Sequence, residues 1–212
     1  LNYDGLYGIN NINRFLQSDN PNPAFYWDSW IYKVDDPVIF NEFNRFYPTL
    51  YNNLKGWIRQ IKKGSAAIQF DIEVDMPLNE FAANTAGFEL LDCNVPGHSL
   101  IRFSVDHYED DDVREKNSRE VVPFQVAYAI SIHKAQGLEY NSVKVVVTNE
   151  IEELITHNIF YTAITRARKK LRIYWMPETQ HKVIVEMKPL SCKQDAYIIS
   201  NKHNMGIINN YK

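Results

Sequence analysis

The chain has 212 residues, of which 45% are hydrophobic and 23% are charged, and its formal net charge is −3 at pH 7. This is ordinary globular composition, and the net charge indicates a nucleic-acid partner only if cations gather locally. The two cysteines have no metal-type spacing and no apolar run reaches about 20 residues, so we expect a cytoplasmic protein without a membrane span. Because the chain begins with leucine, we also expect a fragment or a processed product.

The first part of the chain predicts a helix followed by short strands. Apolar residues at helical spacing predict an amphipathic helix over residues 5–17, with Ile9, Ile12, Phe15 and Leu16 on one face. Beyond Lys33, runs rich in Val, Ile, Phe and Trp predict the strands of a small barrel or curled sheet. The runs are D-D-P-V-I-F-N, L-K-G-W-I-R-Q-I, A-A-I-Q-F-D-I-E-V and I-R-F-S-V. The acidic stretch 109–115 is typical of a solvated loop.

Aromatic and cationic residues alternate at the start of this β-rich region. Two interpretations stay open: a stacking surface for single-stranded nucleic acid, or the core and hairpin residues of a small barrel. Asn52-Asn53 is typical of a tight turn. The residues concerned are Phe43, Arg45, Phe46, Tyr47, Tyr51, Lys55, Trp57 and Arg59.

After Pro123 the pattern predicts strands at Val126–Ile132, Val143–Thr148 and Leu171–Met176. A helix of about 18 residues, starting at Ile151, is predicted between the last two. Strand, turn, strand, helix, strand is the alternation of a mainly parallel α/β sheet, in which ligands lie at the carboxyl ends of the strands. The tail beyond Pro177 contains V-I-V-E-M and A-Y-I-I-S, which suggest edge strands.

The stretch S-I-H-K-A-Q-G-L-E, residues 131–139, lies at the end of the first of these strands. It combines several donors with a glycine, which lets the backbone approach a ligand closely. From local chemistry alone, a solvent loop is equally consistent with it.

Five basic residues cluster at the end of the predicted helix: Arg166, Arg168, Lys169, Lys170 and Arg172. Cations at a helix C-terminus are stabilised by the helix dipole, which is the simpler interpretation of the cluster. Arg166, however, falls near Ile155 and Ile159 on the helical wheel, inside the apolar stripe. An arginine there is costly unless it meets an anion, which predicts a phosphate or carboxylate partner.

The sequence contains no motif for binding a metal ion or for cradling a triphosphate. The histidines have no regular metal-ligand spacing, so no metal site is predicted, and no G-x-x-x-x-G-K-[S/T] occurs. We therefore expect that this chain does not hold a nucleoside triphosphate alone.

Two segments together resemble superfamily 1 helicases. They are A-Y-A-I-S-I-H-K-A-Q-G-L-E-Y and, some 20 residues later, F-Y-T-A-I-T-R-A-R. Both are similar to motifs of the second RecA-like domain of the UvrD/RecD-like group. G-I-N-N-I-N-R-F-L-Q and D-D-P-V-I-F-N-E-F-N also resemble RecD-like sequences, the second at the entry to a small β-barrel inserted in that domain.

The resemblance implies a fold and a division of the chain. The fold is α/β, a RecA-like, mainly parallel sheet with helices on both faces and an inserted small β-barrel subdomain. Residues 1–34 and 123–180 would form the second motor domain, 35–122 the insertion, and 181–212 a C-terminal extension.

The resemblance also implies roles for single residues. Arg166 would be an arginine finger for ATP and Mg²⁺ that are bound mainly by the N-terminal RecA-like domain of the same polypeptide, and Thr165 would help to set it. Gly137 and Glu139 would face the nucleotide. The residues expected to contact single-stranded DNA are Ser131, His133, Lys134 and Gln136.

The implied function is that of the C-terminal part of an ATP-dependent DNA helicase or translocase, inactive as an ATPase alone. Three alternatives stay open: part of an RNA helicase, a non-catalytic nucleic-acid-binding module with a degenerate RecA-like fold, and an unrelated α/β domain.

Overall fold

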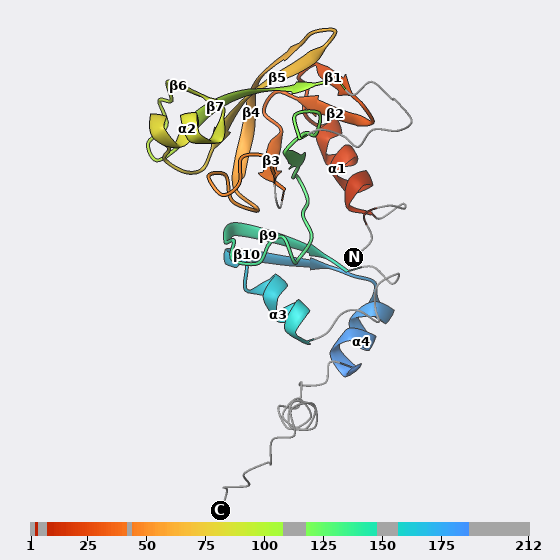
Figure 1. Ribbon diagram of the computed structural model, residues 1–212. Coiled ribbons are helices and arrows are strands. Elements are labelled where there is room, and N and C mark those ends of the chain that lie inside the picture. Colours follow the sequence, from red (N-terminus) through yellow and green to blue (C-terminus); the bar gives the residue numbers. More distant parts are fainter. Residues whose placement is uncertain (1–2, 4–7, 42–43, 108–117, 148–156, 187–212) are drawn as a thin grey trace, which may run out of the picture. The chain divides into compact units, whose positions relative to one another are not determined.

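The computed structural model describes residues 3, 8–41, 44–107, 118–147 and 157–186, which form two compact units. One unit comprises the described residues up to Lys134, and the other comprises those from Ala135 onward. Figure 1 labels the elements of both. The acidic stretch 109–115 and the segment A-Y-I-I-S lie outside the described residues. The domain boundaries inferred from the sequence stay a prediction.

A six-stranded antiparallel sheet dominates the first unit, with the strand order β6-β7-β5-β4-β3-β8. Four of its strands are those predicted from the apolar runs, which confirms that part of the interpretation. In chain order the strands are β3 (Pro37–Phe40), β4 (Lys55–Lys63), β5 (Ala67–Val74), β6 (Glu89–Leu91), β7 (Ser99–Asp106) and β8 (Phe124–Val126). Among the described residues β6 and β8 each have one neighbour, so closure into a barrel stays a prediction.

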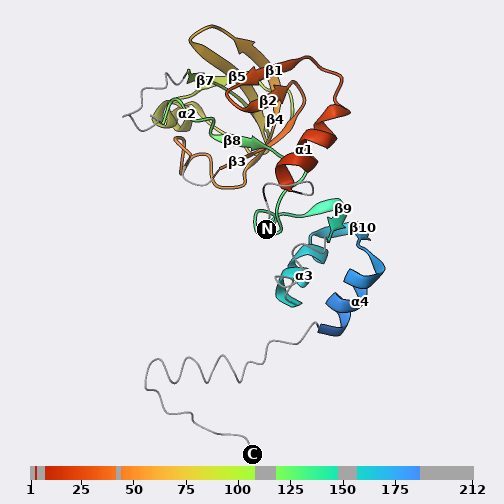
Figure 2. The ribbon, with the colours of Figure 1, turned by 90° about the vertical axis from the view of Figure 1, so that its right-hand side faces the viewer.

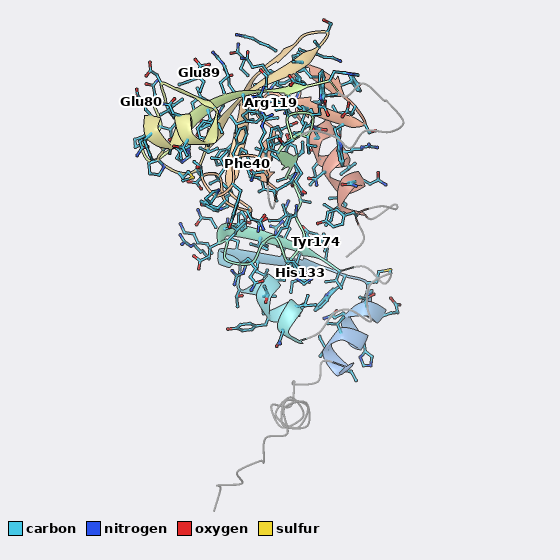
Figure 3. The ribbon with its side chains drawn as sticks, in the orientation of Figure 1. Phe40, Glu80, Glu89, Arg119, His133 and Tyr174 are labelled. Atoms are coloured by element: carbon cyan, nitrogen blue, oxygen red, sulfur yellow. The ribbon has the colours of Figure 1, made fainter. Side chains whose placement is uncertain are left out.

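Alternation explains the sheet. Along β7 every second residue is buried, as expected for a strand with one face on a core. The buried rings of Phe70, Phe103 and Phe124 pack against one another with centroid separations of 5.1–6.2 Å. Phe40, on β3, is fully buried and lies among the side chains that fill this unit in Figure 3.

Two helices and a hairpin complete the first unit. Helix α1 (Ile9–Ser18) confirms the predicted helix within the described residues, and β1 (Ala24–Trp27) pairs with β2 (Trp30–Lys33) in an antiparallel hairpin that the sequence analysis did not predict. The short helix α2 (Glu80–Ala86) is capped by the side chain of Asn79, which accepts from the Ala82 N–H, and ends at Gly87 in a left-handed conformation.

The most buried side chains of α1 are polar. Asn13 and Gln17 are buried, whereas Phe15 is 74% exposed. Asn13 and Gln17 are four residues apart and therefore lie on the same side of the helix. Of the predicted apolar stripe, Ile9, Ile12 and Leu16 are half-buried, and only the assignment of Phe15 to the inner face is wrong.

The second unit is built on two parallel strands, β9 (Tyr140–Val146) and β10 (Ala167–Tyr174), with helix α3 (His157–Ile164) between them in sequence. Figure 2 shows α3 beside this strand pair, and α3 contacts β9. Helix α4 (Pro177–Glu186) follows. This is the parallel β–α–β part of the prediction, and it is the only parallel pairing among the described strands.

The prediction of a mainly parallel sheet is therefore not supported: the structure is mixed α/β with a mainly antiparallel sheet. The predicted strand Val126–Ile132 ends at Val126 and belongs to the antiparallel sheet through β8. Beyond it, the Ala127 N–H donates to the Pro37 carbonyl and Ala129 pairs with a side chain, so no ladder continues.

The predicted helix after Ile151 is described only from His157 and ends at Ile164. The Thr165 hydroxyl donates to carbonyls of the last turn, and Ala167 then pairs with Tyr140 on β9. Arg166 consequently lies in a turn, and the argument that placed it in an apolar helical stripe is wrong. The predicted edge strand at V-I-V-E-M is also wrong over residues 183–186, which belong to α4.

Candidate functional site

Arg166 lies directly after α3 and is held by three hydrogen bonds. Its Nε donates to the Thr162 carbonyl at 2.9 Å, its Nη1 to the Leu138 carbonyl at 3.1 Å, and its Nη2 to the Thr165 hydroxyl at 3.1 Å. The side chain is half-buried. These bonds occupy three of the five guanidinium N–H groups, and the other two have no partner among the described contacts.

The same contacts bring Arg166 to the loop formed by residues 137–139. The Tyr140 N–H donates to the Arg166 carbonyl at 2.9 Å, so this loop and the turn after α3 are also joined through their backbones. All four residues predicted to serve the nucleotide site lie within the second unit: Gly137, Glu139, Thr165 and Arg166.

Gly137 has φ +81°, a left-handed conformation that glycine adopts without strain. A Cβ built there would have no atom within 4 Å, so the backbone at this point is open to a ligand.

Glu139 has a partner that the sequence analysis did not assign. Its Oε2 accepts from Arg168 Nε at 2.6 Å and forms an ion pair with Nη2 of the same guanidinium. Both side chains are more than half exposed, so the pair contributes less than about 1 kcal/mol. Tyr140 on β9 pairs with Ala167 on β10, so their chain neighbours Glu139 and Arg168 lie at adjacent strand ends. No spacing in the sequence reveals this proximity.

Ser131, His133 and Lys134 lie in the first unit, at its C-terminal end. Ser131 is buried and its hydroxyl accepts from the Lys134 N–H at 3.3 Å, so it starts the turn at residues 132–137. The Lys134 ammonium donates to Gln125 Oε1 at 2.5 Å. His133 is exposed, as is Gln136 in the second unit. Of the four residues predicted to contact single-stranded DNA, His133 and Gln136 are therefore the two that are exposed to solvent.

The aromatic stretch divides between core and surface. Phe46 is buried, and Arg45 lies over its ring at 4.6 Å while donating to the Ser104 carbonyl. Tyr47 and Tyr51 are exposed, whereas Phe43 lies outside the described residues. Phe46 is thus a core residue of this unit, and the stacking interpretation stays a prediction for the two tyrosines.

Beside this stretch, Trp57 stacks on His98 with a centroid separation of 6.0 Å. Glu73 lies between two cationic partners, accepting from Arg59 at 2.8 Å and contacting His98 Nδ1 at 2.7 Å. Burial raises the pKa of Glu73, but hydrogen bonds from Arg59 and His98 outweigh it and hold the pKa below its ordinary value.

The basic cluster lies on a strand instead of a helix end. Apart from Arg166, its members belong to β10 and are exposed: Arg168, Lys169, Lys170 and Arg172. The helix-dipole interpretation therefore does not apply to them. Within the described ranges, no group of three or more His, Cys, Asp or Glu side chains could hold a metal ion. None of the described helices is long and apolar enough to cross a bilayer.

The 137–139 loop and the turn that carries Arg166 both lie in a stretch of the chain that matches a known protein family. Residues 126–174 match the model of the UvrD-like helicase C-terminal domain, which covers the 131–139 stretch, α3 and Arg166. The predicted resemblance to the C-terminal domain of UvrD/RecD-like superfamily 1 helicases is confirmed.

Several of the relatives that the chain matches are RecD proteins. It is 23% identical over 188 residues to the RecBCD enzyme subunit RecD of Buchnera aphidicola subsp. Schizaphis graminum, covering 86% of this chain and 25% of the relative. It is 28% identical over 138 residues to the ATP-dependent RecD2 DNA helicase of Deinococcus radiodurans, covering 63% and 18%. To RecD of Mycolicibacterium smegmatis it is 39% identical over 49 residues, covering 23% and 9%. The chain therefore spans a quarter or less of the length of these relatives.

Proposed function

We propose that this chain is the C-terminal motor part of an ATP-dependent DNA helicase or translocase. In this proposal it supplies the arginine finger Arg166 and part of the single-strand binding surface. ATP and Mg²⁺ would be held mainly by an N-terminal RecA-like domain of the same polypeptide.

The observation that carries the proposal is the anchoring of Arg166. Three hydrogen bonds fix its guanidinium beside residues 137–139 while two N–H groups stay available. An arginine held in this way stabilises negative charge on a phosphoryl group during transfer without a large entropic cost of ordering. Thr165 would act as a positioning residue, because its hydroxyl accepts from Arg166.

The residues of the 137–139 loop fit a nucleotide in part. The open backbone at Gly137 can approach phosphate or sugar closely. Glu139 would accept from a sugar hydroxyl through Oε1, because both described contacts of Arg168 are to Oε2. Magnesium would find its ligands outside the described residues.

In this proposal His133 in the first unit and Gln136 in the second each contact the single strand, since each is exposed in its own unit. Ser131 and Lys134 would act indirectly: Ser131 shapes the turn, and Lys134 reaches a phosphate only by exchanging its Gln125 bond. Salt-dependent binding is expected, because phosphate contacts release counterions.

The decisive experiment is Arg166→Ala in the full-length protein, with single-stranded-DNA-stimulated ATP hydrolysis as the measurement. We expect kcat to fall roughly 10³-fold, the scale for arginine fingers, with single-strand affinity unchanged. Lys170→Ala is the matched control, because it removes an exposed cation of the same basic cluster on β10. Equal turnover by the wild type and the Arg166 variant would remove Arg166 from the mechanism.

A further inference from the structure

A buried polar network lies next to the residues that are predicted to contact single-stranded DNA, and the family resemblance does not explain it. Asp36, on the turn before β3, is fully buried. Its carboxylate accepts from four donors, two on each oxygen. The donors are Gln17 Nε2, the Lys33 N–H, Asn20 Nδ2 and the Tyr128 hydroxyl.

The network joins α1 and the β1–β2 hairpin to the chain after β8. The Lys33 ammonium donates to the carbonyl of Gln17, in the last turn of α1, at 3.1 Å and to that of Asn20, just beyond the helix, at 2.6 Å. Tyr128 reaches Asp36 from the other side at 2.8 Å. Burial, together with the hydrogen bond to Asp36, raises the pKa of Tyr128 to about 12, so the phenol stays protonated and continues to donate.

Asn13 holds the next residue of the same segment. Its Nδ2 donates to the Ala129 carbonyl at 2.9 Å, and its Oδ1 accepts from the Ala129 N–H at 2.8 Å. The side chain thus satisfies both backbone groups of Ala129, as a neighbouring strand would. The contact spans 116 residues of sequence.

The segment held in this way leads directly into the turn that carries His133. Tyr128 and Ala129 are fixed by side chains of the turn before β3 and of α1, and Ser131 begins the next turn two residues later. Fixing residues 128 and 129 therefore fixes the direction in which residues 131–134 leave the unit.

We propose that Asn13 is a positioning residue that, with the Asp36–Tyr128 hydrogen bond beside it, sets the course of residues 128–134 and so the presentation of His133 to a nucleic-acid strand. The effect on strand binding rests on the proposed function, whereas the effect on the backbone does not.

The test compares Asn13→Ala with Asn11→Ala in the purified chain. Asn11 is an exposed residue of the same type on the same helix. Amide hydrogen exchange, resolved by NMR, should show the Ala129 amide exchanging at least about 5-fold faster in the Asn13 variant only, since one backbone hydrogen bond is lost. Amides in the central strand β5 should keep their protection in both variants.

Strand binding is measured on the same samples, by the fluorescence anisotropy of a labelled oligothymidylate. We expect affinity to fall about 3- to 10-fold in Asn13→Ala, to fall similarly in His133→Ala, and to stay at the wild-type value in Asn11→Ala. If Asn13→Ala does not fold, Tyr128→Phe replaces it, since it removes one donor to Asp36 and keeps the ring; a similar fall in affinity is then expected.

The outcomes distinguish the positioning role of Asn13 from the proposed function in nucleic-acid binding. Unchanged exchange at residues 129–134 in a folded Asn13 variant overturns the inference, and so does faster exchange with wild-type strand affinity. If the wild-type chain binds no oligonucleotide at any ionic strength, the proposed function fails, and the exchange measurement alone decides whether Asn13 positions the segment.

Discussion

Asp36→Asn is the sharpest test of the buried network, because it preserves shape and removes only charge and acceptor capacity. Each carboxylate oxygen of Asp36 accepts two hydrogen bonds, so the amide nitrogen of an asparagine must face two donors whichever way it is turned. A hydrogen bond to a charged group contributes about 1.5–3 kcal/mol, and a buried donor left unsatisfied costs about 1–3 kcal/mol.

Two such bonds are lost, and the remaining two are made to a neutral acceptor. Allowing for relaxation, we expect the free energy of unfolding to fall by about 3–4 kcal/mol, a large part of the roughly 5–15 kcal/mol of a typical domain. The assay is urea unfolding followed by tryptophan fluorescence, since Trp27, Trp30 and Trp57 all lie in the unit that contains Asp36.

Asp35→Asn is the control at the neighbouring position. The Asp35 side chain is 57% exposed and pairs with Arg59 at the surface. Losing this ion pair should lower the free energy of unfolding by less than about 1 kcal/mol. If the Asp36 variant is destabilised no more than the Asp35 variant, the network does not stabilise the fold and the reasoning above is refuted.

Three further predictions follow from other contacts. The pKa of Glu73 is lower in the folded state than in the unfolded state. The contribution of Glu73 to stability is therefore complete above about pH 5 and is lost as the pH falls below the unfolded pKa of about 4.3. Glu73→Gln should flatten this part of a profile of stability against pH, and an unchanged profile would contradict the assignment. Gly56→Ala would bring a Cβ to 2.8 Å from the Glu73 carbonyl oxygen, which cannot move away easily, so we expect a loss of about 1–3 kcal/mol in urea unfolding, with Gly64→Ala, at 3.3 Å from its nearest neighbour, affected less. The purified chain should show no ATP turnover in a coupled assay while binding single strands with an affinity that decreases with salt; robust turnover by this chain would contradict the assignment of nucleotide binding to another domain.

Local patterns were sufficient wherever the physics is local. The strands at 37–40, 55–63, 67–74 and 99–106 follow from short runs rich in Val, Ile, Phe and Trp between turn formers, because such side chains pack well on a sheet whatever its partners are. The motif around Arg166 was likewise recognised from residue order alone, and Arg166 does contact the 137–139 loop, although for a different reason from the apolar stripe first inferred.

Tertiary contacts decided the rest. The run after Val126 has the composition of a strand, yet its backbone is satisfied by Asn13 and by β3, residues remote in sequence. The basic residues after Arg166 have good helix propensity, but pairing with β9 draws them into a strand. Helical spacing showed that one face of α1 is distinct, but only the carboxylate of Asp36 and the backbone of Ala129 make the polar side chains of Asn13 and Gln17 the buried ones. A buried polar residue is stable only when its partner is present, and a partner supplied by a distant segment leaves no periodic signal in the sequence.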